Sequence, residues 1–313
     1  MSNNDNLNNA KHAKYDEFYT KLSDIESELT YYKEHFKGKI IYCNCDNPYE
    51  SNFVRYFLMN FKALGLKKVI TSNYDENQEI TLFNLNDTDT NSSAYSLRAE
   101  SEPDLSNYYD YIKKSSKELK YSGDFRSPEC IELLKEADIV VTNPPFSLMT
   151  PFIYQMVKHK KQFLIVGPMN AITYEEIFPL IRSNQLWLGY NHIKSFITPD
   201  GEKTFGNVIW YTNLDIDKRH KDLPLTRTFN SEDYQTYDNF NAIEVGKLKD
   251  IPKDYEGIMG VPITFLEHHN PEQFDIVGCS YSYGLPEGWS PNTNMTVSIN
   301  GQEIYKRILI KKH

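Results

Sequence analysis

The stretch Asp138-Ile139-Val140-Val141-Thr142-Asn143-Pro144-Pro145-Phe146 decides the fold that the sequence predicts. Its first part is a short apolar run rich in β-branched side chains, which is typical of a buried strand. Two consecutive prolines then end the strand, because they fix φ and donate no backbone hydrogen bond. A helix is expected to follow as far as Lys158, and residues 163–166 form the next apolar run. This alternation predicts an α/β fold around a parallel sheet.

The same alternation is present upstream of this stretch. An amphipathic helix is expected to end at Gly38, and residues 39–43 and 67–71 have the pattern of short buried strands. Between them a helix is expected from Pro48 to about Gly65. A strand–helix–strand unit of this kind predicts parallel pairing with a right-handed crossover. A further helix is expected over 128–137, capped by Ser127.

Three other segments differ in composition. Residues 1–12 are rich in Asn and are expected to be disordered. Residues 75–120 are polar and acidic, which predicts a partly mobile surface insertion that ends in a helical run over 111–119. Residues 191–313 contain more Tyr, Thr and Pro and shorter strands, which predicts a smaller β-rich region. It would follow a larger α/β domain over 13–190.

The charge of the chain is unevenly distributed. The 313 residues carry 34 Lys and Arg against 43 Asp and Glu, a net charge of -9. Residues 75–110 hold nine acidic residues and one basic residue, so the rest of the molecule is nearly neutral. Basic clusters at 158–161, 218–221 and 306–312 could therefore still present positive charge to a nucleic acid, although such clusters are more often simply solvated.

The composition also limits the class of protein. A hydrophobic content of 40% excludes general disorder, and the longest apolar runs are too short to span a bilayer. The N-terminal sequence does not resemble a signal peptide, and four cysteines do not form a disulfide framework in a chain of this length. A cytoplasmic globular protein is expected. No metal site is expected, because Cys43, Cys45, His268, His269 and Cys279 lack the spacing of a zinc site.

The loop after residue 142 carries the strongest chemical signal. Ligands of open α/β sheets bind at the carboxyl ends of the strands, where this loop lies. The side-chain oxygen of Asn143 and the carbonyl of Pro144 can accept two hydrogen bonds from one planar NH₂ group, and Phe146 can stack on a heteroaromatic ring. Such a site orients an exocyclic amine toward an electrophilic methyl group. The alternative interpretation is a rigid strand-to-helix turn with an Asn cap.

These residues are similar to the catalytic motif of amino-methyltransferases that depend on S-adenosylmethionine, and the whole chain resembles the EcoRI-type adenine-specific DNA modification methylases. One departure is that Cys-Asn-Cys-Asp-Asn-Pro replaces the usual glycine-rich loop after the first strand. The resemblance extends over about residues 12 to 313. The stretches that carry it are 16–20, 42–48, 123–127, 138–146, 170–174, 207–214, 260–266 and 307–310.

The resemblance implies a Rossmann-like methyltransferase sheet with helices on both faces. Residues 13–190 would bind S-adenosylmethionine, and residues 191–313 would form a smaller target-recognition region. The implied catalytic residues, which would hold the target adenine, are Asn143, Pro144, Pro145 and Phe146. The implied cofactor-binding residues are Phe18, Tyr19 and Thr20 before the first strand, Cys43, Asn44 and Asp46 at the methionine moiety, and Asp124 and Phe125 at the adenine moiety.

The implied function is site-specific methylation of adenine N6 in double-stranded DNA, with the target base flipped out of the duplex. The implied setting is a restriction-modification system, whose endonuclease shares the site but need not bind this protein. A monomer is expected, since methylation of one strand at a time needs no two-fold partner. Two alternatives remain: an RNA or protein-glutamine amino-methyltransferase, and an inactive DNA-binding relative.

Overall fold

The computed structural model describes residues 19–74, 94–198, 201–280 and 296–313. The chain forms two compact units: Met1–Met169 with Gly189–Leu214, and Asn170–Leu188 with Asp215–His313. Residues 1–12, expected to be disordered, and Phe18, expected to bind the cofactor, lie outside the described residues. No helix in the described part of the chain is long and apolar enough to cross a membrane.

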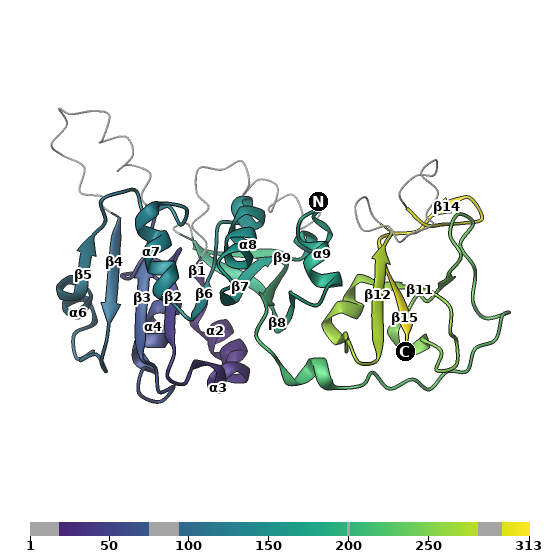
Figure 1. Ribbon diagram of the computed structural model, residues 1–313, viewed down its shortest axis with the longest axis horizontal. Helices are drawn as coiled ribbons and strands as arrows, with labels where there is room; N and C mark the ends of the chain where they lie inside the picture. Colours follow the sequence, from purple (N-terminus) through teal and green to yellow (C-terminus); the bar gives the residue numbers. More distant parts are fainter. Residues whose placement is uncertain (1–18, 75–93, 199–200, 281–295) are drawn as a thin grey trace, which may run out of the picture. The chain divides into compact units, whose positions relative to one another are not determined.

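The first unit is built on a nine-stranded sheet in the order β1-β8-β9-β7-β6-β2-β3-β4-β5 (Figure 1). The four central strands β7, β6, β2 and β3 are parallel to one another. Outside them, β4 pairs antiparallel with β3, and β9 pairs antiparallel with β7. The α/β fold with a parallel core is therefore confirmed. The strands are β1 (Tyr19–Thr20), β2 (Ile40–Cys43), β3 (Lys68–Ser72), β4 (Tyr95–Ala99), β5 (Ser116–Glu118), β6 (Ile139–Thr142), β7 (Gln162–Pro168), β8 (Trp187–Thr198) and β9 (Gly201–Thr212).

Helices connect the parallel strands. The helices of this unit are α2 (Leu22–Leu29), α3 (Lys33–Phe36), α4 (Asn52–Met59), α6 (Tyr108–Ser115), α7 (Pro128–Glu136) and α8 (Met149–Lys158), with the 3-10 turns η1 (Thr30–Tyr32) and η2 (Phe146–Leu148). The crossover through α4 leads from β2 to β3, whereas those through α7 and α8 lead in the opposite direction along the sheet. Right-handed crossovers in opposite directions place these helices on opposite faces.

Helix α4 begins four residues later than the sequence predicts. Its N-cap is Ser51, whose Oγ accepts hydrogen bonds from the backbone N–H groups of Phe53 and Val54. Residues 48–50 form a turn before it. The prediction for α7 is confirmed, since the Oγ of Ser127 accepts from the N–H of Cys130 at 3.2 Å and Pro128 opens the helix.

The acidic segment is only partly an insertion. Residues 75–93 lie outside the described residues, but Tyr95–Glu118 forms β4, α6 and β5, which extend the sheet beyond β3. The polar composition hides a small apolar set in which Leu97 and Ile112 are fully buried. The helix lies at Tyr108–Ser115 rather than 111–119. The prediction of a separate surface segment was therefore wrong for this part.

The hairpin β8–β9 also belongs to the large sheet, because β9 pairs antiparallel with β7 from Leu164–Thr212 to Pro168–Val208. A division at residue 190, as composition suggests, would separate these strands from their sheet. Residues Gly189–Leu214 belong to the same compact unit as the parallel core. The polar, Thr-rich appearance of this hairpin arises because residues 201–204 are exposed.

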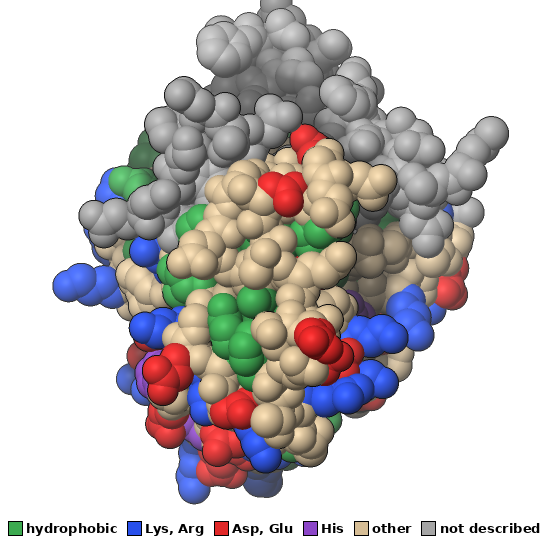
Figure 2. Space-filling model, turned by 90° about the vertical axis from the view of Figure 1, so that its right-hand side faces the viewer, with side chains coloured by type: hydrophobic (Ala, Val, Ile, Leu, Met, Phe, Trp, Pro, Cys, Tyr) green, Lys and Arg blue, Asp and Glu red, His purple; other side chains and the backbone are tan. Residues whose placement is uncertain are grey.

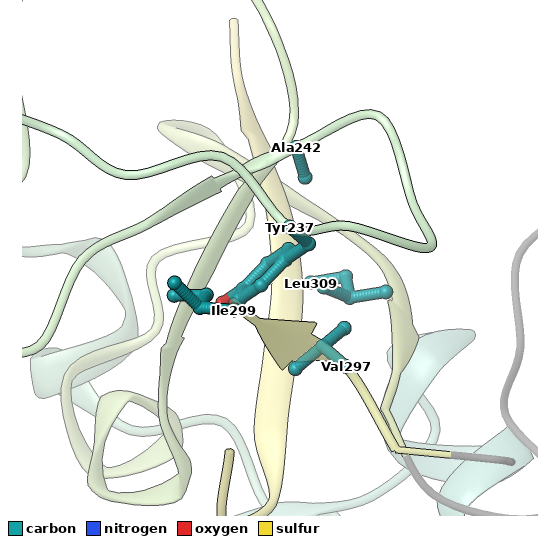
Figure 3. Packing of buried hydrophobic residues seen from close by; sticks show 5 residues of the cluster. All are labelled: Tyr237, Ala242, Val297, Ile299 and Leu309. Carbon is teal, nitrogen blue, oxygen red and sulfur yellow. The ribbon is translucent and has the colours of Figure 1, made fainter. Parts of the chain in front are cut away.

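The second unit contains a four-stranded sheet in the order β10-β11-β15-β12, a two-stranded ribbon and short helices. Its core includes Tyr237, Ala242, Val297, Ile299 and Leu309, which come together from separate segments (Figure 3). The elements are β10 (Ile243–Glu244), β11 (Met259–Pro262), β12 (Phe274–Cys279), β13 (Ser298–Ile299), β14 (Gln302–Glu303), β15 (Arg307–Lys312), α9 (Phe178–Arg182), η3 (Met169–Thr173, which begins in the first unit), η4 (Asp217–His220), η5 (Leu248–Asp250) and η6 (Ile263–His268).

One ion pair ties β10 to β15 within this second unit. The Nη2 of Arg307 lies 2.7 Å from Oε1 of Glu244, and its Nε donates to the same oxygen at 2.9 Å. The hydroxyl of Tyr237 donates to the other carboxylate oxygen of Glu244. Since Arg307 and Glu244 are largely buried, the loss of either would leave an uncompensated charge in the core.

Candidate active site

The strand order reverses between β2 and β6, and open α/β sheets have a crevice at such a reversal, beyond the carboxyl ends of the strands. Along the strand order, β3 lies next to β2 on one side, whereas β6 and then β7 lie on the other side of β2. Ligands of open α/β sheets bind at such a reversal of strand order, beyond the carboxyl ends of the strands. Cys43 is the last residue of β2, and Asn143 directly follows β6. The structure therefore brings these two candidate site residues to the same crevice.

The Asn143 loop is held between buried neighbours. Pro144 is buried, and Asn143 and Pro145 are partly exposed. Phe146 is buried, and its ring meets that of Phe196 edge to face at a centroid distance of 6.1 Å. Because the backbone of Phe196 pairs with Thr20, β8 connects the Asn143 loop to the β1 element.

The β1 element approaches the loop after β2 from the other side. The hydroxyl of Tyr19 donates to the carboxylate of Glu50, and the amide nitrogen of Asn52 donates to the carbonyl of Thr20 at 2.9 Å. Three of the segments predicted to form the site therefore lie around one edge of the sheet. These are β1, the loop after β2 and the loop after β6.

Two buried polar atoms at this edge fit a polar ligand. The side-chain nitrogen of Asn44 and the hydroxyl of Thr20 are inaccessible to solvent and have no hydrogen-bond partner among the described residues. Buried polar atoms are normally hydrogen-bonded, because each unsatisfied one costs about 1–3 kcal/mol. Both residues are predicted to bind the cofactor, and an amide nitrogen and a hydroxyl suit the carboxylate and ammonium groups of a methionine moiety.

Both oxygens of the Asp46 carboxylate accept hydrogen bonds from protein hydroxyl groups. One oxygen accepts from the hydroxyl of Ser51 at 2.6 Å, and the other accepts from the hydroxyl of Thr142. Its backbone N–H donates to the carbonyl of Ser72 at 3.0 Å. The structure thus places Asp46 in the crevice, with its carboxylate hydrogen-bonded to protein groups from α4 and β6.

Burial raises the pKa of Asp46 to about 6, even though the hydrogen bonds from Ser51 and Thr142 lower it. An unfolded Asp titrates near about 3.9, so the folded state binds an additional proton between these two values. The stability contributed by this proton is complete below the unfolded pKa and is lost as the pH rises through about 6.

We therefore expect Asp46→Asn to alter the pH dependence of stability. Relative to the variant, the wild-type protein should lose up to about 3 kcal/mol of unfolding free energy as the pH rises from about 4 to about 7. Urea unfolding of both proteins across this range measures the difference. A difference that is independent of pH would show that Asp46 does not titrate in this way.

Asp124 lies close to the same loop. It follows Gly123, which has a φ of 74°, and a Cβ there would lie 1.9 Å from the carbonyl oxygen of Asn73. The turn therefore requires glycine. Asn73 directly follows Ser72, whose carbonyl accepts from the N–H of Asp46, so the turn before Asp124 lies near the loop after β2. After burial, the negative charges of Asp46 and Asp124 both contribute to raising the pKa of the Cys45 thiol.

The carboxylate of Asp124 is paired with its neighbour Arg126. One oxygen accepts from the backbone N–H and the Nε of Arg126 at 2.7 and 2.9 Å, and the other accepts from its Nη2. Burial raises the pKa of Asp124, but these bonds outweigh it and the net shift is downward. Phe125 is buried, and the centroid of its ring lies 5.1 Å from that of Phe152.

The sequence analysis missed several residues that shape this edge. Thr142, Ser51, Phe196 and Arg126 all contact predicted site residues. Only Ser51 carried a readable signal, as a serine two residues before an apolar helical run. The four cysteines are free, and the described residues contain no group of three or more His, Cys, Asp or Glu that could hold a metal ion.

A parallel core with the Asn143 loop and the Asp46 loop at its strand reversal is consistent with a methyltransferase fold. The model of one family, described as the adenine-specific methyltransferase EcoRI, matches residues 6–313. The chain belongs to this family.

Curated relatives are similar over nearly the whole chain. The Type II methyltransferase M.EcoRI of Escherichia coli is 45% identical, covering 97% of this chain and 95% of its own length. The Type II methyltransferases M.MgeORF184P of Mycoplasma genitalium and M.MpnI of Mycoplasma pneumoniae are 36% and 34% identical, and each alignment covers 98% of both chains. No solved structure matches the chain significantly. The family resemblance of the sequence is thus confirmed.

Proposed function

We propose that this protein methylates N6 of adenine at a specific sequence in double-stranded DNA, as the modification enzyme of a restriction-modification system. The observation that carries this proposal is the Asn-Pro-Pro-Phe loop at the β2–β6 crevice, beside buried polar groups that fit a cofactor. Membership of an adenine-specific methyltransferase family and the Type II relatives support the substrate and the setting.

Asn143, Pro144 and Phe146 would hold the target adenine. The side-chain oxygen of Asn143 and the carbonyl of Pro144 accept the two hydrogens of the exocyclic amine, and Phe146 supports the base. Accepting both hydrogens directs the nitrogen lone pair toward the methyl group and stabilises the positive charge that develops on nitrogen. Pro145 keeps the loop stiff, and the nitrogen returns to neutrality by losing one proton to solvent.

S-adenosylmethionine would supply a methyl group activated by a positively charged sulfur. On this chain Thr20, Asn44 and the neighbouring Tyr19, Phe18 and Cys43 would bind its methionine end, and Asp124 would accept from the amino group of its adenine. Phe125 contributes through the shape of the turn, because its ring packs on Phe152. Asp46 would orient the loop that contacts the cofactor.

A base in a duplex cannot reach a crevice at the edge of a sheet. The target adenine would therefore be flipped out of the stack, at a cost of a few kcal/mol that contacts in the pocket offset. The region over 191–313, of which residues 215–313 belong to the second unit, would recognise the target sequence. On the face shown in Figure 2, Lys and Arg side chains lie among Asp and Glu, so contacts with phosphates would be local.

The remaining features of the proposal follow from the substrate. An enzyme that modifies chromosomal DNA acts in the cytoplasm of a bacterium, and methylation of one strand at a time requires only a monomer. The companion endonuclease would recognise the same sequence without binding this protein.

Transfer of labelled methyl from S-adenosylmethionine to unmethylated duplex DNA, and in parallel to RNA, tests the proposal. The products are digested to nucleosides and identified by mass. We expect N6-methyldeoxyadenosine from DNA and no label in RNA. Label in RNA or in protein glutamine would favour a different amino-methyltransferase, and cofactor binding without transfer to any substrate would indicate an inactive DNA-binding relative.

A further inference from the structure

The hydroxyl of Thr142 bridges the crevice between β6 and the loop after β2. It accepts a hydrogen bond from the backbone N–H of Cys45 at 3.2 Å and donates one to the carboxylate of Asp46. Strands β2 and β6 pair through Ile41 with Ile139 and Tyr42 with Val140. The hydroxyl of Thr142 joins the segments that follow this pairing. The side chain of Thr142 is fully buried, so water does not compete for these bonds.

Asp46, the partner of Thr142, is itself held by three further hydrogen bonds from α4 and β3. Its carboxylate accepts from Ser51 at the start of α4, and its backbone carbonyl accepts from the hydroxyl of Thr71 at 2.5 Å. Its N–H donates to the carbonyl of Ser72 at the end of β3. The hydroxyl of Thr142 therefore connects the end of β6 to a point that is fixed relative to β2, β3 and α4.

The backbone after Thr142 has little conformational freedom, so it cannot compensate for a displacement of Thr142. Asn143 follows directly, and Pro144 and Pro145 both have a fixed φ. A shift at the end of β6 would thus be passed to the side-chain oxygen of Asn143. A displacement of about 1 Å in a reacting group can lower a rate by about 100-fold.

We propose that Thr142 is a positioning residue, whose hydroxyl sets the place of Asn143 relative to the cofactor-binding loop. The inference rests on the proposed function of the Asn143 loop and adds a residue to it. Thr142 itself would contact neither the base nor the cofactor. Its effect should therefore appear in the rate of methyl transfer rather than in cofactor affinity.

The chain contains a matched control for this residue. Thr212 is the last residue of β9, is also fully buried, donates to the carbonyl of Phe163 at 2.7 Å and accepts from the N–H of Leu214 at 3.0 Å. It is followed by Asn213, as Thr142 is followed by Asn143. Because β9 runs antiparallel to β7, its end lies at the opposite edge of the sheet from the crevice.

The test compares Thr142→Val, Thr142→Ser and Thr212→Val in the full-length protein. Single-turnover methyl transfer to duplex DNA is measured at saturating cofactor, together with the Kd for S-adenosylmethionine and the Tm. We expect Thr142→Val to slow transfer by roughly 100-fold while the Kd changes by less than about threefold. Thr142→Ser should recover most of the rate, and Thr212→Val should lower the Tm similarly with a nearly unchanged rate.

Three results would overturn the positioning role. Equal losses of rate in Thr142→Val and Thr212→Val would show a general effect of removing a buried hydrogen bond. A loss confined to the Kd would place Thr142 among the cofactor contacts. A failure of Thr142→Ser to restore the rate would exclude the hydroxyl as the cause. Each of these leaves the wild-type activity intact, whereas a wild-type protein that methylates no DNA overturns the proposed function and the positioning role together.

Discussion

Asn143→Ala should reduce single-turnover methyl transfer by roughly 100- to 1,000-fold, the range seen when one preorganised group is removed from a transition state. The alanine variant keeps the carbonyl of Pro144 but loses the second acceptor for the amine. The lone pair of the amine is then no longer directed, and the charge that develops on nitrogen is less stabilised. The Kd for S-adenosylmethionine should remain close to that of the wild-type protein, because Asn143 is proposed to contact the base rather than the cofactor.

Asn213→Ala is the matched control for this experiment. Asn213 also follows a strand of the same sheet, where its side-chain oxygen accepts from the N–H of Phe163 at 2.8 Å and its nitrogen donates to the carbonyl of Lys161 at 2.9 Å. Its replacement should lower stability without a comparable loss of rate. Near-normal turnover in Asn143→Ala would contradict the mechanism proposed for the loop.

Asp124→Ala should weaken the binding of S-adenosylmethionine by roughly 10- to 100-fold, the equivalent of one hydrogen bond to a charged group. The rate at saturating cofactor should fall much less, because Asp124 would contact the adenine of the cofactor and not the reacting atoms. Isothermal calorimetry gives the Kd, and single-turnover kinetics give the rate.

Arg126→Ala separates this role from a structural one. The pair of Asp124 with Arg126 is partly exposed, so its contribution to stability is small, about 0–1 kcal/mol. If Asp124 acts only by holding Arg126, the two variants should weaken cofactor binding equally. A clearly larger effect of Asp124→Ala is expected, and equal effects would remove Asp124 from the cofactor site.

The parallel core was predictable because its signals are local. The apolar runs before Asn44 and Asn143, and the Ser127 cap with Pro128, each act within a few residues of the chain. The position of the Asn143 loop then followed from a general rule about strand ends. The cofactor-binding residues, in contrast, were proposed only from the family resemblance, because the loop after β2 lacks the usual glycine-rich pattern.

Long-range pairing is what the sequence did not disclose. The contact of Thr142 with Asp46 joins residues 96 apart in the chain, and that of Phe146 with Phe196 joins two aromatic residues with no distinguishing context. The pairing of β9 with β7 was missed because a polar hairpin has the same composition whether it joins a large sheet or a small one. The strand Tyr95–Ala99 was hidden by the acidic residues around it.

The most direct test of the central claim is to map N6-methyladenine in the genome of a bacterial host that lacks its own adenine methylases. The full-length protein is expressed there, and the Asn143→Ala variant serves as the control. The proposed function predicts N6-methyladenine at nearly every occurrence of one short sequence with the wild-type protein, and almost none with the variant. A genome without N6-methyladenine, or equal methylation by both proteins, would contradict the account.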